Sequence, residues 1–307
     1  MAGETDVHAR FERAQARLID HHDLDASSRF ETVDEPVERI HYLHAGSGTP
    51  VVFLPGVASP AALFVPLMAG FEGEFELFAP DRPGRGLSDP YTHRKGDIRA
   101  FTRTFLDAFL DAIGVDEVAF VASSFGGFQA FAYALDRPAR VDRISFVGSP
   151  AGLSRSLPIP YRLLGVKLIN RLMFRLIRAD TIDDVRRSMA QINVEDPDAL
   201  SEPMLETILY AGQLPDRSRS LRTLFETTAG IRGMSKHMLV RDEVDELTQP
   251  LQFVWGSEDY FYPPELGREA TASLEAVEFH ELEGHGHTPW LEPENAVGDF
   301  VSDFLSD

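Results

Sequence analysis

The sequence contains no cysteine, and this absence excludes two kinds of site. A chain without thiols can form neither disulfide bridges nor a thiolate-ligated metal centre. The N-terminal residues MAGETDVHAR also lack the apolar run of a secretory signal peptide. Together these two features predict a protein of the reducing cytoplasm.

Basic residues are scarce relative to acidic ones. The 307 residues include 29 Lys and Arg against 49 Asp and Glu, which gives a formal net charge of −20, and Lys95, Lys167 and Lys236 are the three lysines. A chain this acidic repels phosphate backbones, which argues against general nucleic-acid binding. A salt-rich cytoplasm is one hypothesis for this composition, because carboxylates hold water while salt screens their repulsion. Compositional drift in a GC-rich genome is the alternative.

Residues 118–135 form a stretch of eighteen residues without a charge. That length meets the minimum for a membrane-spanning helix. The pair Gly126–Gly127 near its middle, together with its serines and glutamine, is instead typical of a strand, a sharp turn and a helix. We therefore predict that this stretch lies in a soluble core.

Strands and helices are predicted to alternate over most of the chain. Because strands that alternate with helices build a mostly parallel sheet covered on both faces, we predict an α/β fold with a doubly wound sheet. Predicted strands span 37–46, 50–56, 75–81, 117–123, 143–149, 251–256 and 277–284, and predicted helices span 8–20, 100–114, 126–138, 263–274 and 293–305.

Between Ser149 and Gln249 this alternation stops. Four segments have helical patterns there, at 156–178, 185–193, 203–214 and 219–234. We predict that residues 1–152 and 250–307 form the core, with a leading helix at 8–20, and that residues 153–249 form an inserted helical lid.

The turn ASSFG, residues 122–126, places a serine between a strand and a helix. A nucleophilic serine on such a turn has strained backbone angles, so the residues two before and two after it must be small. Ser124 has Ala122 and Gly126 at these positions, whereas Ser123 would have two larger side chains. Ser124 is therefore the predicted nucleophile.

At these residues the chain resembles the α/β-hydrolase fold superfamily, in its lidded serine-hydrolase branch. The resemblance covers roughly residues 28–306 and implies the chain order serine, acid, histidine. The segment WGSEDYFYP supplies the acid, for which Asp259 is favoured over Glu258, and the segment EGHGHTPWLEPE supplies His287. The resemblance thus implies a Ser124–Asp259–His287 triad.

The histidine has a neighbour that could take its place, His285, since both follow a glycine. In the family, a proline stands two residues after the catalytic histidine and a glutamate five after. His287 has Pro289 and Glu292 at these positions, whereas His285 has neither. A further family proline is displaced by one residue, to Pro293.

The resemblance also implies an oxyanion hole made by the backbone amides of Val57 and Phe125. Pro55 stands where most relatives have histidine, while the loop DRPGRGLSD, residues 81–89, follows the family pattern. None of these parts requires a cofactor or a metal, and His280, His285 and His287 lack an acidic residue at ligand spacing. We therefore predict neither.

Residues 153–187 of the lid carry a local excess of positive charge, with eight Lys and Arg against three Asp. We favour a lid helix whose apolar face covers the pocket and whose arginines face solvent or pair with acidic residues elsewhere. The alternative is an interfacial helix that rests on anionic lipid or holds an acidic substrate.

The predicted function is that of a serine hydrolase that forms an acyl-enzyme with a small carboxylic ester, lactone or related acyl compound. Carbon–carbon bond hydrolases and aminopeptidases share the scaffold and are alternatives within the family. A ligand-binding protein that has lost the chemistry is the alternative from a different class.

Overall fold

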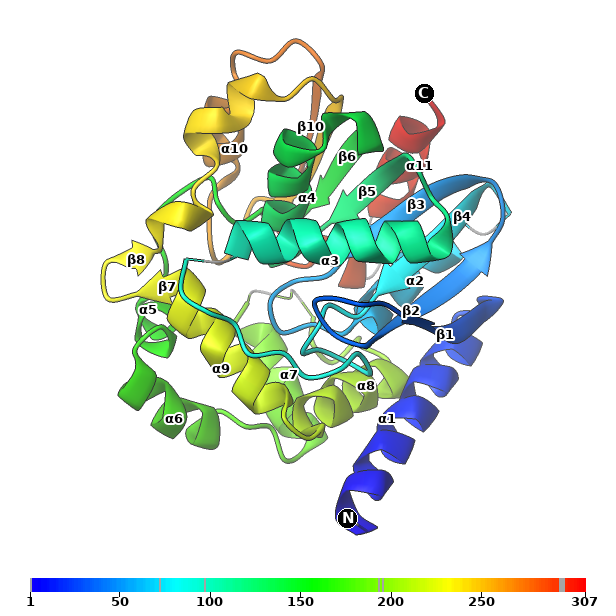
Figure 1. Ribbon diagram of the computed structural model, residues 1–307, viewed down its shortest axis with the longest axis vertical. Coiled ribbons are helices and arrows are strands. Elements are labelled where there is room, and N and C mark those ends of the chain that lie inside the picture. The colour runs from blue at the N-terminus through cyan, green and yellow to red at the C-terminus, as the bar shows by residue number, and fades with distance from the viewer. Residues whose placement is uncertain (1, 72, 97, 193, 195, 293–295) are drawn as a thin grey trace.

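The computed structural model describes residues 2–71, 73–96, 98–192, 194, 196–292 and 296–307. Its centre is an eight-stranded sheet in the order β1-β2-β4-β3-β5-β6-β9-β10 (Figure 1). β2 is antiparallel to β1 and β4, and the remaining neighbours are parallel. The strands are β1 (Ala26–Thr32), β2 (Arg39–Gly46), β3 (Thr49–Leu54), β4 (Phe75–Pro80), β5 (Val118–Ala122), β6 (Val141–Val147), β9 (Leu251–Gly256) and β10 (Val277–Leu282).

Helices cover both faces of this sheet, as the alternation predicts. Residues of β3 alternate between two hydrophobic layers, with Val52 and Leu54 in one and Val51 and Phe53 in the other. The first layer includes side chains of α3 (Ile98–Ile113), α4 (Phe125–Asp136) and α10 (Pro264–Ala270), and the second includes side chains of α2 (Val65–Ala69) and α11 (Val297–Ser306). A strand that is buried on both sides reads as a continuous apolar run, which is why these strands were predictable. The predicted fold class is confirmed.

The uncharged stretch 118–135 forms β5 and most of α4, and both lie in the core. Within the part of the chain that the structure describes, no helix combines the length and hydropathy that a membrane span needs.

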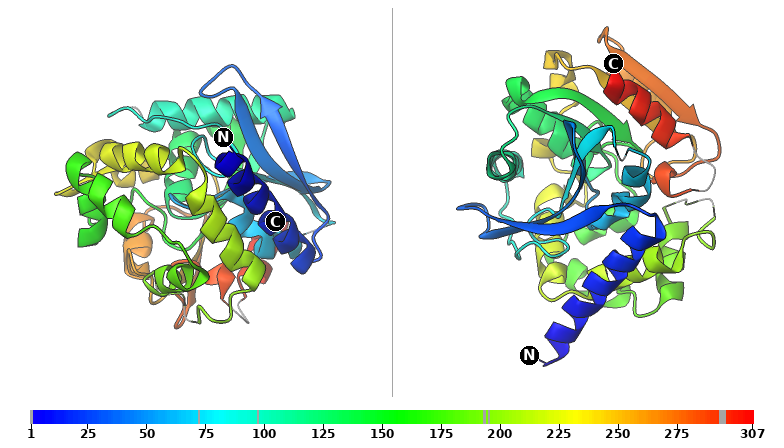
Figure 2. Two further views of the ribbon diagram at one scale, coloured as in Figure 1. Left: turned by 90° about the horizontal axis from the view of Figure 1, so that it is seen from below. Right: turned by 90° about the vertical axis from the view of Figure 1, so that its right-hand side faces the viewer.

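Some elements differ from the sequence prediction. The leading helix α1 spans Ala2–His21 rather than 8–20, and it packs along α8 at the edge of the molecule (Figure 2). Strand β1 and the segment formed by the 3₁₀ turn Ala61–Phe64 and α2 were not predicted. β1 is an edge strand with mostly exposed side chains, so its sequence has no apolar alternation to reveal it.

In its described residues, the segment predicted as a lid contains five α-helices. They lie below the sheet in Figure 1. The predicted helix 156–178 is broken at Gly165, where a Cβ atom would lie 2.2 Å from the carbonyl oxygen of Ala229. The predicted helix 219–234 ends at Thr228, because a tight hairpin of β7 (Ala229–Gly230) and β8 (Gly233–Met234) follows. The helices are α5 (Ile159–Leu164), α6 (Lys167–Leu176), α7 (Ile182–Ala190), α8 (Glu202–Gln213) and α9 (Arg217–Thr228). Short 3₁₀ turns in this segment lie at Lys236–Met238 and Arg241–Glu246, and others outside it lie at Pro138–Arg140 and Pro289–Leu291.

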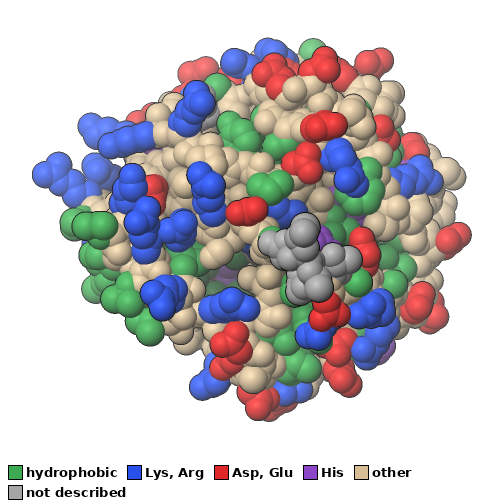
Figure 3. Space-filling view, turned by 60° about the horizontal axis from the view of Figure 1, so that its bottom comes forward, with side chains coloured by type: hydrophobic (Ala, Val, Ile, Leu, Met, Phe, Trp, Pro, Cys, Tyr) green, Lys and Arg blue, Asp and Glu red, His purple; other side chains and the backbone are tan. Residues whose placement is uncertain are grey.

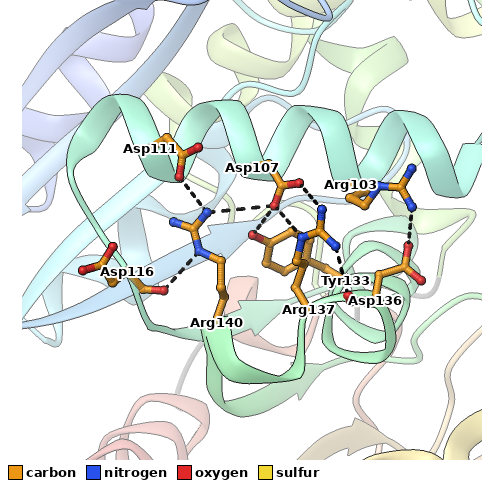
Figure 4. A network of polar contacts seen from close by, with 8 residues as sticks. All are labelled: Arg103, Asp107, Asp111, Asp116, Tyr133, Asp136, Arg137 and Arg140. Carbon is orange, nitrogen blue, oxygen red and sulfur yellow. Dashed lines mark hydrogen bonds and ion pairs between the residues drawn. The ribbon is translucent and has the colours of Figure 1, made fainter.

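A polar network joins α3 to α4 on the outside of the first layer (Figure 4). Asp107 of α3 accepts hydrogen bonds from Tyr133 Oη at 2.9 Å and from Arg137 Nη2 at 3.0 Å. Arg140 pairs with Asp111 at 2.7 Å and donates through Nε to the carbonyl oxygen of Asp116. Each exposed pair contributes little by itself, but together they fix α4 against α3. The position of α4 in turn fixes the serine turn from which it starts.

Candidate active site

Ser124 lies between β5 and α4 with φ 53° and ψ −116°. Positive φ is rare for a residue with a side chain, and a backbone strained in this way is typical of functional turns. The helix begins very close to β3, since a Cβ atom on Gly126 would lie 1.9 Å from the carbonyl oxygen of Leu54. This contact is the physical reason for the small residue two positions after the serine.

Val57 and Phe125, whose backbone N–H groups are the predicted oxyanion donors, lie close to this serine. Both residues line a cavity together with Ser124 and His287. Among the described residues, neither N–H has a hydrogen-bond acceptor. Two free donors beside a serine hydroxyl are what an oxyanion needs.

Asp259 and His287 meet although 28 residues separate them in the chain. His287 Nδ1 lies 2.9 Å from Asp259 Oδ2. The other carboxylate oxygen, Oδ1, accepts the N–H of Phe261 at 2.9 Å, and Oδ2 also accepts the N–H of Ser149 at 3.0 Å. Burial opposes ionisation of Asp259, but the charge and hydrogen bond of His287 and these N–H donors outweigh it and hold its pKa below the usual range. The carboxylate is therefore ionised and oriented toward the imidazole.

The alternative candidates from the sequence for the acid, the histidine and the serine do not take these positions in the structure. Glu258 is exposed, and its N–H donates to the carbonyl oxygen of His285. The ring of His285 instead lies 3.0 Å, through Nδ1, from the carbonyl oxygen of Glu283. Ser123 is buried and is not among the residues that line the cavity.

Glu292 supports the loop that carries His287. Its carboxylate oxygen Oε1 accepts the N–H of Gly286 at 2.8 Å, and the side chain is buried. This contact gives a physical reason for a glutamate five residues after the histidine. The neighbouring Pro293 lies outside the described residues.

Ser149 is a site residue that the sequence did not reveal. It follows β6, and its Oγ lies 3.2 Å from His287 Nδ1 while its N–H donates to Asp259. Among the described residues no hydrogen bond joins Ser124 Oγ to the ring of His287, a contact that often tightens only when substrate binds. The position of Ser149 at the carboxyl end of a parallel strand, like those of Ser124 and Asp259, was the available signal.

Arg82 is a second such residue, in the loop 81–89. Its Nη2 donates to the carbonyl oxygen of Val57 at 2.8 Å, and its guanidinium lies 4.7 Å from the centre of the Phe125 ring. The side chain is 1% exposed, and burial followed by the charge of Arg85 lowers its pKa to about 9. Arg82 thus contacts both residues that present the free N–H groups.

The cavity extends from these polar groups into the segment predicted as a lid, residues 153–249. Its remaining lining is nearly all apolar, and no Lys, Arg, Asp or Glu belongs to it in the described part of the chain. Burial raises the pKa of Tyr161 to about 12, with a smaller contribution from Tyr260, so this phenol is neutral. The largest apolar and aromatic residues of this part of the lining include Leu157, Tyr161, Phe225, Met234, Met238 and Phe261.

A metal site is not apparent in the described residues, since no three His, Asp or Glu side chains are grouped to hold an ion. The described residues that meet at this cavity include a serine, a histidine bonded to a carboxylate, and two residues with unbonded N–H groups, near the carboxyl ends of parallel strands.

Residues 49–293 match the model of the alpha/beta hydrolase fold family. The chain belongs to this α/β-hydrolase family. Curated relatives are hydrolases as well. One from Dechloromonas aromatica (strain RCB), a 2-hydroxy-6-oxononadienedioate/2-hydroxy-6-oxononatrienedioate hydrolase, is 29% identical over 87% of this chain and 91% of the relative. The predicted family and the prediction of a hydrolytic enzyme are confirmed.

Solved structures share the same α/β-hydrolase fold. Carboxylesterase CesB from Bacillus subtilis superimposes with a TM-score of 0.77 at 17% identity, covering 98% of each chain. A meta-cleavage product hydrolase from Pseudomonas fluorescens IP01 superimposes with a TM-score of 0.70 at 18% identity, covering 91% of this chain and 97% of that one. At such identities the likeness establishes the fold alone.

Proposed function

We propose that this α/β-hydrolase is a serine esterase that forms an acyl-enzyme at Ser124. The observation that carries the proposal is the shared cavity, in which a serine at positive φ lies with two free N–H groups and with a histidine bonded to a buried carboxylate. This combination is the one that acyl transfer requires.

In the proposed reaction Ser124 Oγ attacks the carbonyl carbon of the ester while His287 removes its proton. Asp259 holds Nδ1 of the ring, so Nε2 is the nitrogen that accepts the proton and then gives it to the departing alcohol. A water molecule, deprotonated by the same nitrogen, then attacks the acyl-enzyme and releases the acid. The N–H groups of Val57 and Phe125 would stabilise the oxyanion in both the acylation step and the deacylation step, each by about 3 kcal/mol.

The lining of the cavity favours a neutral, apolar acyl group. A dienedioate such as the one in the name of the Dechloromonas aromatica relative carries two carboxylates, and burying a charge without a partner is costly. The described lining of this cavity offers no Lys or Arg to pair with them. An ester or lactone of a small apolar acid needs no such partner.

Carbon–carbon bond hydrolysis is the second candidate, and the similarity to that relative over most of both chains favours it. The same serine, histidine and N–H groups would serve either reaction, since both pass through an acyl-enzyme or a tetrahedral oxyanion. Only the substrate recognised by the lid distinguishes the two.

A substrate panel tests these proposals. We expect p-nitrophenyl esters of short and medium chain length to be hydrolysed, with kcat/KM rising with acyl length until the cavity is filled. A 2-hydroxy-6-oxo-dienedioate should react much more slowly, as measured by the loss of its absorbance. Faster cleavage of the dienedioate than of every ester would replace the first candidate with the second.

A fluorophosphonate label tests the nucleophile independently of the substrate. The label should attach to Ser124 in the folded protein and should fail to attach after unfolding. A folded protein that is neither labelled nor active on any member of the panel would indicate a ligand-binding protein instead.

A further inference from the structure

Large hydrophobic side chains are exposed mainly in one part of the lid. Six of the eight exposed ones in the described chain fall between residues 159 and 177. Scattered apolar residues are ordinary on a protein surface, whereas a contiguous group marks an interaction site. The six are Ile159 (68% exposed), Leu168 (78%), Ile169 (38%), Leu172 (60%), Leu176 (73%) and Ile177 (53%).

Helix α6 carries four of these six side chains, and three of the four lie beside a row of positive charges. Leu168, Leu172 and Leu176 recur every four residues and so lie on one line along the helix, and Lys167, Arg171 and Arg175 form the adjacent line. We call these six residues the α6 ridge. Figure 3 shows hydrophobic side chains beside Lys and Arg at the left of the molecule, the side on which Figure 1 places α6.

The charges of the α6 ridge are not neutralised by nearby acids. All three basic side chains are exposed, and none forms an ion pair with a described Asp or Glu. The next basic residue, Arg178, does pair with Asp180 at 3.3 Å. The ridge is therefore a cationic patch on a protein whose formal net charge is −20.

The opposite side of α6 already has a packing partner. Asn170 is fully buried and donates through Nδ2 to Glu226 Oε1 of α9 at 3.0 Å. The ring of Phe174 lies 6.1 Å from that of Phe225, which lines the cavity. The ridge is thus not an inner face left uncovered, because the helix is held to the lid by its other side.

We propose that the α6 ridge docks this protein onto the surface of a bilayer that contains anionic phospholipid. A short helix with basic residues beside leucines lies in the plane of the membrane, with the leucines at the boundary of the acyl chains and the basic groups at the phosphates. Charge complementarity selects this occupant, because anionic lipid attracts a cationic patch and repels a chain whose formal net charge is −20, so the ridge is the part that would face the lipid.

A second copy of the chain fits the ridge less well. A ten-residue helix is about 15 Å long, which is short for a stable dimer interface that buries about 800 Å² per partner. Two copies would also bring the acidic surfaces of two chains together.

Vesicle co-sedimentation at low salt tests the proposal with the full chain. The probes are vesicles of phosphatidylglycerol and phosphatidylcholine in equal parts and vesicles of phosphatidylcholine alone. We expect binding to the first and at least tenfold weaker binding to the second. No binding to the anionic vesicles, or equal binding to both, would overturn the proposal.

Matched variants assign the binding to the ridge. Lys167→Gln/Arg171→Gln/Arg175→Gln should weaken it by roughly 100-fold, since each basic residue near an anionic surface contributes about fivefold. The control Arg13→Gln/Arg29→Gln/Lys95→Gln removes the same charge from exposed positions outside the lid and should change it less than threefold. An equal loss in both variants would show that overall charge governs binding and would contradict the proposal.

A third variant, Leu168→Gln/Leu172→Gln/Leu176→Gln, tests the apolar half. We expect it to lose vesicle binding and to keep the hydrolysis rate of a soluble p-nitrophenyl ester, so a failure of the esterase proposal is distinguishable from a failure of this one. If light scattering gives a dimer that this variant dissociates, and the wild type does not bind vesicles, a second copy is the occupant and the proposal is wrong.

Discussion

Among the described residues, two groups of serine, histidine and aspartate can be compared, and one of them has the surroundings of a working site. In the first group, His287 lies between Asp259 and the cavity that Ser124 lines. In the second, Ser28 Oγ lies 2.8 Å from His41 Nε2, and His41 Nδ1 lies 2.7 Å from Asp81 Oδ2. Judged by hydrogen bonds alone, the second group is the more complete triad.

The surroundings separate the two groups. Ser28 is on the edge strand β1 with an exposed side chain and ordinary φ, and neither Ser28 nor His41 lines the described cavity. Asp81 also accepts the N–H groups of Ala61 and Leu87, so it holds the loop 81–89 in place. Nucleophilic catalysis thus depends on a strained serine, free N–H donors and a cavity, which hydrogen-bond distances do not report.

Removing each serine gives the largest difference between the groups. Ser124→Ala should lower kcat for p-nitrophenyl esters by a factor of roughly 10⁴ to 10⁶. Ser28→Ala is the matched control and should stay within about twofold of the wild type, because its hydroxyl only satisfies His41. Steady-state kinetics with circular dichroism on both variants checks this. A large loss in Ser28→Ala would mean that the second group is the active one.

Neutralising each aspartate separates activity from stability. Asp259→Asn should lower kcat by roughly 10⁴, because the amide no longer fixes the reactive tautomer of His287. Asp81→Asn should instead lower the free energy of unfolding by about 1–3 kcal/mol, because it weakens three hydrogen bonds to a buried carboxylate. Urea titration and kcat per folded molecule measure the two effects, and equal losses of activity would remove the distinction.

Arg82 connects the two serine–histidine–aspartate groups, since it follows Asp81 of the second group in the chain and contacts Val57 and Phe125 beside the first group. Arg82→Met should lower kcat by about 10- to 100-fold with little change in KM, because the oxyanion donors lose their support. Arg217→Met is the control, since Arg217 is equally buried but donates to the carbonyl oxygen of Gly86. If both variants lose the same fraction of kcat, Arg82 has only a structural role.

The pH dependence of stability is the smallest of these effects. Burial acts to raise the pKa of Asp81, but His41 and the N–H groups of Ala61 and Leu87 lower it below its usual value of 3.8. A group whose pKa is lower in the folded state stabilises above the unfolded value and loses this contribution as the pH falls through the folded value. The stability difference between wild type and Asp81→Asn should therefore be complete above about pH 4 and shrink below it, as urea midpoints would show. A difference that grew in acid would contradict this sign.

Much of the fold followed from local patterns. The buried strands β3, β5 and β9 were predictable because both of their faces are covered. Ser124 was predictable because the close contact at Gly126 requires a small residue there, and the sequence shows one. β1 was not, since an exposed edge strand needs no apolar residues. The division into core and lid, the cytoplasmic location and the salt-rich environment stay predictions.

The sequence by itself determined the alternation of the buried strands with helices, the size constraint around Ser124 and the amphipathic pattern of α6, because each depends on residues a few positions apart. Tertiary structure alone decided that Asp259 and Ser149 meet at the ring of His287, that Arg82 contacts Val57 and Phe125, and that the α6 ridge faces solvent. Those contacts join chain segments 25 to 138 residues apart, and only the packing of the sheet and its helices brings them together.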